Sequence, residues 1–368
     1  MNIIFVCRKF GNVAGGMERM CVAIMNSMVK KGHNIALITW DFDGAEAHYQ
    51  VSPNINWLKL NCGDPDDKAT WKIRWKRLVR AREFIRSFNT DVIIGFQSGG
   101  FIFGYVTSLF LRIPCVAAER VSPDTWRHVR TSLIDRFIDT YALILATKIT
   151  VQFPNYINYY PFFLKKKLIT IPNPIFDQPK VQRGEHEKIL LNVGRLCTQK
   201  NQKFLIKSFG KIHKKHSDWK LVIVGDGDDE MELKELTEKM QLSKNVIFTG
   251  AIKNVSEWYS RADVFLFPSI FEGFPNALSE ALAHGLPAVG FQETFGVNEL
   301  IINNINGLLT ENDEKSFSNA INYLIENNTI RKSMSEESIM SVSKYHPKYI
   351  FEQWNDFFLS LVSRNNQS

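Results

Sequence analysis

Short apolar strands alternate with amphipathic helices in two successive runs along this chain. The first run opens with the apolar residues 3–7, which precede a helical pattern over residues 17–31 that ends at Gly32. Three prolines fall within residues 172–179, and the alternation restarts at residues 189–193. Alternation of this kind is typical of βαβ units with parallel sheets. The chain is therefore predicted to form two doubly wound α/β domains.

The other elements of both runs follow from the same apolar patterns. The predicted strands are residues 35–39, 92–95, 115–119, 221–224, 246–249 and 264–267, and the predicted helices are residues 74–88, 101–111, 201–216, 230–240 and 255–261. A chain of 368 residues has the length of two domains. We place the first domain at 1–172, a linker at 173–186 and the second domain at 187–345. Ligands of open parallel sheets bind beyond the carboxyl ends of the strands, so we expect the site in the cleft between the two domains.

Composition indicates a globular protein of a reducing compartment. Hydrophobic residues make up 45% and charged residues 23%, which excludes disordered and coiled-coil chains. The five cysteines form no C-x-x-C pair, so neither a disulfide framework nor a zinc ribbon is expected. The amino terminus reads as a strand and lacks the features of a signal peptide. The most apolar stretch, 101–118, is interrupted by Arg112 and Pro114, so we predict a cytoplasmic protein without a transmembrane helix.

Positive charge is concentrated in the first half of the chain. Residues 1–172 hold 23 Lys and Arg against 13 Asp and Glu, whereas the remainder holds 22 against 25. Basic residues cluster over 72–86 and again over 165–167, and three tryptophans accompany them, namely Trp71, Trp75 and Trp126. Such a surface suits an anionic membrane, and a solvated helix face is the alternative. No recognition helix, zinc pattern or RNP-like strand is visible, so nucleic acid is not an expected partner.

The segment Gly194–Asn201 follows the first strand of the second domain and opens a helix. Arg195 and Lys200 would both project from this βα loop beside a helix amino terminus. Backbone N–H groups together with two cations are what a pyrophosphate needs. Two ordinary surface cations are the alternative.

The segment Glu272–Glu280 follows the predicted strand 264–267, and Pro275 suits the beginning of a helix. The unpaired backbone N–H groups of Asn276, Ala277 and Leu278 would then face a phosphate. Glu280 lies one turn further in and can accept hydrogen bonds from ribose hydroxyls, while Glu272 can hold a sugar hydroxyl. A carboxylate that merely favours the helix dipole is the alternative for these glutamates.

The Glu-x7-Glu block, with Gly194-Arg195 and Lys200 upstream, resembles the retaining GT-B glycosyltransferases of the GT4 type, the glycosyl transferases group 1. The resemblance implies that Arg195 and Lys200 bind the donor diphosphate, that Glu272 contacts the transferred sugar and that Glu280 binds the ribose. It also implies two Rossmann-like domains facing across a cleft, with a last helix over 346–368 that crosses back onto the first domain. The expected donor-binding residues are Gly15, Gly16, Gly194, Arg195, Lys200, Asp226, Ile252, Glu272, Phe274, Asn276, Ala277, Leu278 and Glu280.

The first domain carries the expected acceptor side. Gly15 and Gly16 match the family's glycine loop, where backbone can approach the leaving group closely. Glu119 stands where many relatives carry a His or Glu of the catalytic cleft, so the expected catalytic residues are Arg195, Lys200, Glu272 and Glu119. The expected acceptor-binding residues are Glu18, Arg120 and Trp126. The stretch 119–123 resembles bacterial capsule and lipopolysaccharide enzymes that extend lipid-linked sugars, which implies a polyprenyl-diphosphate-linked glycan as acceptor and the cytoplasmic face of the inner membrane as location.

No metal or other cofactor is expected. Residues 41–43 and 226–228 have the Asp-x-Asp form of metal-dependent transferases, but the second reads more easily as an acidic turn. His213 and His216 lack a third ligand. Cations and N–H dipoles can stabilise a departing diphosphate without a metal.

Three functions remain open at this stage. The first is a retaining glycosyltransferase that moves a hexose or N-acetylhexosamine, from UDP by expectation, to a glycan or lipid-linked glycan. The second is an epimerase or hydrolase of nucleotide-sugars with the same architecture. The third is a two-domain sugar-binding protein without catalysis.

Overall fold

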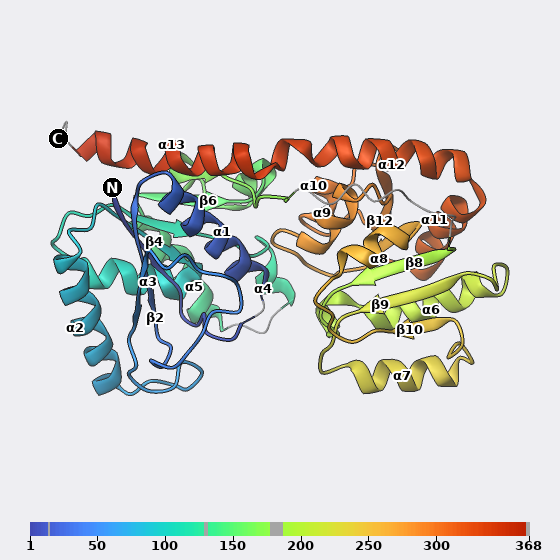
Figure 1. Ribbon diagram of the computed structural model, residues 1–368, viewed down its shortest axis with the longest axis horizontal. Coiled ribbons are helices and arrows are strands. Elements are labelled where there is room, and N and C mark those ends of the chain that lie inside the picture. The colour runs from blue at the N-terminus through green and yellow to red at the C-terminus, as the bar shows by residue number, and fades with distance from the viewer. Residues whose placement is uncertain (14, 129–131, 177–186, 366–368) are drawn as a thin grey trace. The chain divides into compact units, whose positions relative to one another are not determined.

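The structure is a computed structural model that describes residues 1–13, 15–128, 132–176 and 187–365. It divides into two compact units (Figure 1). Unit 1 runs to Pro174 and includes the C-terminal segment from Pro347, and unit 2 runs from Ile175 to His346. Residues 177–186 of the expected linker lie outside the described residues.

Unit 1 is built on a parallel sheet of seven strands in the order β3-β2-β1-β4-β5-β6-β7. The strands are β1 (Asn2–Val6), β2 (Asn34–Thr39), β3 (Ile55–Lys59), β4 (Val92–Phe96), β5 (Cys115–Ala118), β6 (Lys148–Val151) and β7 (Leu168–Thr170). Its α-helices are α1 (Gly16–Lys30), α2 (Trp71–Ser87), α3 (Gln97–Thr107), α4 (Thr125–His128), α5 (Leu133–Ala142) and α13 (Pro347–Asn365), and short 3-10 turns are η1 (Leu143–Leu145), η2 (Pro154–Tyr159) and η3 (Lys165–Lys167).

Unit 2 has a parallel sheet of six strands in the order β10-β9-β8-β11-β12-β13. The strands are β8 (Ile189–Val193), β9 (Lys220–Val224), β10 (Val246–Phe248), β11 (Val264–Phe267), β12 (Ala288–Phe291) and β13 (Gly307–Thr310). The helices are α6 (Gln202–His213), α7 (Glu230–Lys239), α8 (Ser256–Arg261), α9 (Asn276–Ala283), α10 (Val297–Leu300), α11 (Glu314–Glu326) and α12 (Asn328–Val342), and 3-10 turns are η4 (Thr198–Lys200) and η5 (Ser343–Tyr345).

The core of unit 1 explains why its last helix returns to it. Ile350, Trp354 and Phe358 of α13 are fully buried and pack with α1 on one face of the sheet. The ring of Phe358 meets Phe5 of β1 edge-on, with ring centroids 6.2 Å apart. Burial of side chains of this size stabilises the fold by about 2 kcal/mol each. Two doubly wound parallel sheets and a returning C-terminal helix confirm the predicted fold class.

One predicted helix is displaced along the chain. The apolar pattern predicts residues 101–111, whereas α3 covers Gln97–Thr107. Gly95 explains the earlier start, because a Cβ at this position would lie 2.3 Å from the backbone of Phe101. The bare backbone of β4 thus lets the helix pack directly against the strand. The apolar residues after Thr107 are part of a surface turn, in which Phe110 is 93% exposed.

Candidate active site

Two strand-end loops of unit 2 pack backbone against backbone. The loop after β8 begins at Gly194, and the loop after the neighbouring β9 begins at Gly225. Leu196 N–H donates to the carbonyl of Asp226 over 2.7 Å. Gly225 and Gly227 have φ of +138° and +154°, and a Cβ on either would lie within 2.4 Å of a carbonyl oxygen of the first loop, at 2.1 and 2.3 Å respectively. Glycine is therefore required at both positions.

Lys200 and Glu272 meet at the carboxyl edge of this sheet. The Lys200 Nζ lies 2.5 Å from the Glu272 Oε1, and the two side chains are 18% and 8% exposed. The same ammonium lies 5.1 Å from the ring centroid of Phe267, the last residue of β11. The pair thus joins the loop after β8 to the loop after β11, and these strands are neighbours.

Backbone contacts fix the two loops around this pair. Ile270 N–H donates to the carbonyl of Gln199 over 2.9 Å, and the Gln199 Nε2 donates to the carbonyl of Phe271 over 2.8 Å. Thr294 donates through its hydroxyl to the carbonyl of Ser269 over 2.8 Å. The position of Lys200 opposite Glu272 is therefore set by hydrogen bonds to backbone carbonyls as well as by the ion pair.

The start of α9 presents backbone donors beside Glu272. The first helical hydrogen bond runs from Ser279 N–H to the carbonyl of Pro275. The N–H groups of Asn276, Ala277 and Leu278 therefore point beyond the helix start, where the helix dipole favours an anion. The Leu278 side chain is fully buried, so only its backbone can face a ligand.

Glu280 is held in place from a neighbouring helix. Its Oε2 lies 3.3 Å from the hydroxyl of Tyr259 in α8, and that hydroxyl is also 3.1 Å from the carbonyl of Ala277. His284 lies 2.8 Å through Nδ1 from the carbonyl of Glu280 and 2.7 Å through Nε2 from the Ser256 hydroxyl. Glu280 is half-buried.

The remaining donor-side residues differ in exposure. Arg195 is exposed, and its carbonyl accepts a hydrogen bond from the Gln202 amide over 3.0 Å. Asp226 is also exposed and contributes its backbone to the loop contact described above. Ile252 is half-exposed in the loop after β10, and Phe274 is buried with its ring edge-on to Tyr345 at 5.9 Å.

In unit 1, Glu18 fills the space beside the glycine loop. Gly15 is the N-cap of α1 and Gly16 its first residue. A Cβ on Gly15 would lie 2.0 Å from the Glu18 Oε2. The Glu18 side chain is buried, and its negative charge at the helix amino terminus complements the dipole.

Glu119 and Arg120 directly follow β5. The guanidinium of Arg120 donates to the carbonyl of Ile171 over 2.9 Å and to the hydroxyl of Thr150 over 3.0 Å, and lies 5.2 Å from the Trp354 ring centroid. Burial lowers the pKa of Arg120 to about 9. Burial raises the pKa of Glu119 to about 7, with Asp139 adding to the rise and Arg120 opposing it. Trp126 lies in α4, but its side chain is outside what the structure describes.

Gln152 is a candidate residue that the sequence reasoning missed. It follows β6 directly and is 1% exposed. Both atoms of its amide lack a hydrogen-bond partner among the described residues. Buried polar atoms are nearly always paired, so an orphaned amide at a strand end indicates a site for a polar group or water. Gln152 follows β6 and Arg120 follows β5, and these two strands are paired neighbours, so Gln152 lies at the same sheet edge as the predicted acceptor residues. In the sequence, the feature that could have marked Gln152 is its position as a polar residue directly after an apolar strand.

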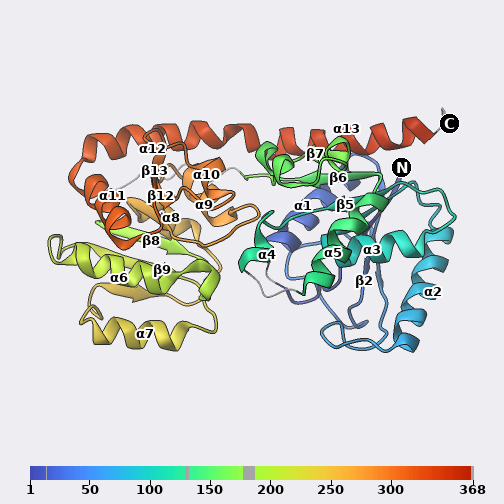
Figure 2. The same ribbon diagram turned by 180° about the vertical axis from the view of Figure 1, so that it is seen from behind.

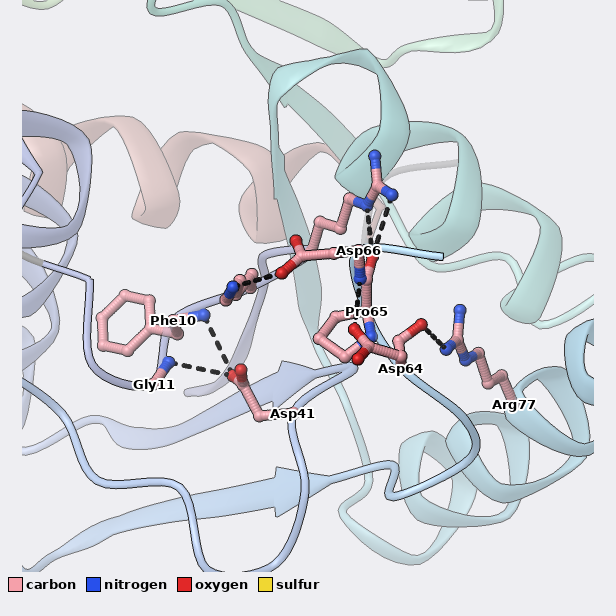
Figure 3. Close-up of polar contacts among 9 residues, drawn as sticks. Phe10, Gly11, Asp41, Asp64, Pro65, Asp66 and Arg77 are labelled. Atoms are coloured by element: carbon pink, nitrogen blue, oxygen red, sulfur yellow. Dashed lines mark hydrogen bonds and ion pairs between the residues drawn. The ribbon is translucent and has the colours of Figure 1, made fainter. Parts of the chain in front are cut away.

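The loops at the amino-terminal strands of unit 1 are fastened by a separate polar cluster (Figure 3). Asp41 is buried and accepts hydrogen bonds from the N–H groups of Phe10 and Gly11 at 3.0 and 3.2 Å. Further contacts join Arg8 to Pro65, Lys9 to Asp66 and Arg77 to Asp64. Asp41 thus acts as a structural acceptor for backbone rather than as part of an Asp-x-Asp motif.

Comparison with known proteins assigns a family to part of the second unit and finds relatives along nearly the whole chain. Residues 175–339 match the family described as Glycosyl transferases group 1. An uncharacterised glycosyltransferase of Haemophilus influenzae is 28% identical over 349 residues, covering 93% of this chain and 95% of the relative. An α-1,4-N-acetyl-D-galactosaminyltransferase of Campylobacter jejuni that acts on GalNAc-α-(1->4)-GalNAc-α-(1->3)-diNAcBac-PP-undecaprenol is 26% identical, covering 96% of this chain and 97% of the relative.

Among solved structures, Anabaena HepE in complex with UDP and glucose matches the fold with a TM-score of 0.76 at 16% identity, covering 98% of this chain and all of HepE. This likeness bears on fold, and it agrees with the two parallel sheets described above. None of the helices in the described residues is long and apolar enough to cross a membrane. The family match over residues 175–339, the glycosyltransferase relatives that span nearly the whole chain and the shared architecture identify the protein as a glycosyltransferase with the GT-B fold, whose residues 175–339 match the group 1 (GT4) family.

Proposed function

We propose that the enzyme transfers a hexose or N-acetylhexosamine from a UDP-sugar, with retention of configuration, to a lipid-linked glycan in bacterial surface polysaccharide synthesis. The observation that carries the proposal is the Lys200–Glu272 pair beside the start of α9. It places a cation, a carboxylate and several backbone donors around one strand-end edge. That is the set of groups that a sugar diphosphate requires.

The roles follow from charge. Lys200 and Arg195 bind the diphosphate together with the N–H groups at the start of α9, and Glu280 accepts hydrogen bonds from the ribose. Glu272 positions the donor sugar and holds the Lys200 ammonium. When the bond between the anomeric carbon and the diphosphate oxygen breaks, the oxygen keeps the electron pair, and these cations and dipoles stabilise the new charge.

The acceptor hydroxyl then bonds to the anomeric carbon on the face that the diphosphate leaves. Its proton passes to an oxygen of the departing diphosphate, so the step needs no further base. Glu119, Glu18, Arg120 and Trp126 of unit 1 are proposed to contact or orient the acceptor. The Campylobacter relative acts on an undecaprenyl-diphosphate-linked glycan, which supports an acceptor of this class.

A donor panel tests the proposal. UDP and a set of UDP-sugars should raise the melting temperature, and UDP release should require a lipid-linked glycan acceptor. The anomeric configuration of the product, read by NMR, should match that of the donor. Products formed from UDP-sugar alone would instead favour an epimerase or hydrolase. Binding of a UDP-sugar without any turnover would favour a sugar-binding protein.

Variants of two neighbouring lysines make the test specific. Lys200→Ala should abolish UDP release, whereas Lys203→Ala should retain it, because Lys203 is about half exposed and pairs with Glu232 away from the site. Wild-type turnover by Lys200→Ala would overturn the assignment of this edge as the donor site.

A further inference from the structure

We propose that an aromatic and basic surface of unit 1, formed by α5, η1 and the segment 162–167, docks the enzyme on an anionic lipid bilayer. This surface is called the α5 face below. Its exposed apolar residues are Phe137, Ile138, Tyr141, Ile144, Leu145, Phe162 and Phe163, and its basic residues are Lys148, Lys165, Lys166 and Lys167. The biological reason for membrane docking rests on the proposed lipid-linked acceptor, but membrane binding itself can be measured without an acceptor.

The aromatic residues of the α5 face form one continuous patch. Phe137 and Tyr141 stack with ring centroids 4.0 Å apart, Tyr141 lies 6.0 Å from Phe163, and Phe163 lies 5.7 Å from Phe162. Phe162 is 85% exposed and Phe137 59%. Contiguous exposed aromatics of this kind mark a surface that is covered in use. Figure 2 shows α5 on the side of unit 1 that carries α3, away from α1.

The lysines border this patch directly. The Lys167 ammonium donates to the carbonyls of Ile144 and Ala146 over 2.5 and 2.8 Å, and the Lys148 ammonium donates to the carbonyl of Lys166 over 3.2 Å. Residues 140–176 contain four lysines and no Asp or Glu. Over 133–176, which also includes α5, five basic residues stand against two acidic ones, Asp135 and Asp139. An apolar patch with this excess of positive charge complements the acyl and headgroup layers of an anionic membrane.

The basic helix α2, which the sequence also marks as a membrane surface, is less suited. Arg77 is buried and donates to the carbonyls of Cys62, Gly63 and Asp64. Arg82 likewise donates to the carbonyls of Thr107 and Leu109. These two arginines therefore fasten neighbouring loops. Acidic residues also lie in and before this helix, namely Asp64, Asp66, Asp67 and Glu83.

The α5 face also adjoins the predicted acceptor residues. Asp139 of α5 adds to the raised pKa of Glu119, and Glu119 in turn adds to the raised pKa of Tyr160, which burial raises most. The same helix thus carries Asp139 near enough to Glu119 to raise its pKa, and it exposes Phe137 and Tyr141 to solvent. The segment after β6 connects Gln152 to Phe162 within unit 1. A bilayer on this face would bring a membrane-bound acceptor to the carboxyl ends of β5 and β6.

Vesicle sedimentation tests the inference. The protein should pellet with vesicles of equal parts phosphatidylglycerol and phosphatidylcholine, and not with phosphatidylcholine alone, and high salt should weaken the binding. Lys165→Gln/Lys166→Gln should lower the partition coefficient about 30-fold. Phe137→Ser/Phe162→Ser should lower it at least about 10-fold. Trp71→Ser/Trp75→Ser on α2 is the matched control and should stay within about twofold of wild type.

Three results would overturn the inference. The first is wild-type binding by both α5-face variants, and the second is loss of binding in the α2 control. The third is a dimer in sedimentation velocity that only Phe137→Ser/Phe162→Ser dissociates, because the α5 face would then bind a second copy of the chain rather than a membrane. UDP titration by calorimetry separates this inference from the proposed function, because the donor residues lie in unit 2. Vesicle binding without UDP binding would refute the proposed function alone, and the reverse would refute the α5 face alone.

Discussion

The ammonium of Lys200 lies 2.5 Å from the carboxylate of Glu272, although 72 residues separate them in the chain. The pair is mostly buried at the carboxyl edge of the sheet of unit 2. Glu272 thus neutralises the charge of Lys200. An incoming diphosphate would add negative charge where one cation and one anion already balance, and we propose that the exposed Arg195 supplies the additional positive charge.

Separating the pair should cost both stability and activity. Lys200→Met leaves the Glu272 carboxylate buried without its cation, and we expect a loss of about 3 kcal/mol in the free energy of unfolding. The double variant Lys200→Met/Glu272→Gln should recover most of that loss, because no unpaired charge remains. Its turnover should stay at least about 100-fold below wild type, because the cation at the diphosphate is missing. Urea denaturation and UDP release measure the two effects. A stable double variant with restored turnover would contradict the catalytic role.

Glu280→Ala should act on donor binding rather than on the chemical step. Loss of the ribose acceptor is expected to raise KM for the UDP-sugar about 10-fold, with kcat within about threefold of wild type. Tyr259→Phe removes only the hydroxyl that lies 3.3 Å from Glu280, and it should give a smaller change in the same direction. Steady-state kinetics over donor concentration distinguish the cases. A fall in kcat with unchanged KM would argue against ribose binding.

Glu119 should make stability depend on pH. Its pKa in the folded protein is raised to about 7, so the folded state binds a proton more tightly than the unfolded state. Its contribution is therefore favourable at low pH and is lost as pH rises through about 7. The change in the free energy of unfolding caused by Glu119→Gln should therefore be more favourable at pH 8 than at pH 5, by up to about 3 kcal/mol. Urea denaturation at both values measures this. An effect of Glu119→Gln that is equal at the two pH values would refute the prediction.

Trp354 should be essential for the stability of unit 1. Its side chain is fully buried between α13 and the sheet, and it also contacts the guanidinium of Arg120. Trp354→Ala is expected to lower the free energy of unfolding by about 4 kcal/mol. Leu359→Ala, at an exposed position of the same helix, should change it by less than about 0.5 kcal/mol. Similar losses in both variants would mean that α13 is stabilised along its whole length rather than through Trp354.

The sequence predicts the sheets and the residue types at the strand ends, because the spacing of apolar residues and the positions of the loops can be read from short stretches of the chain. It places Lys200 and Glu272 in two different strand-end loops, but their pairing depends on the hydrogen bonds of Gln199 with Ile270 and Phe271. Such contacts join loops about 70 residues apart, and no local pattern encodes them.

Other features were hidden for the same reason. Gln152 reads as an ordinary polar residue after a strand, and only its burial without partners marks it. Arg77 reads as part of a basic surface, whereas folding turns it inward to three carbonyls. The start of α3 depends on the contact of Gly95 with Phe101, which follows from the direction of the chain after β4.

The contact between Gly15 and Glu18 changes how mutagenesis of the glycine loop should be interpreted. A methyl group at position 15 would collide with a carboxylate oxygen three residues later, before it met any ligand. Alanine at position 15 would displace that carboxylate from the first turn of α1 and leave the amino terminus of the helix without its compensating negative charge. A loss of function in such a variant could therefore result from displacement of the Glu18 carboxylate. If a second substitution at Glu18 restores function, displacement of the carboxylate is the cause; if it does not, the added methyl group excludes a substrate.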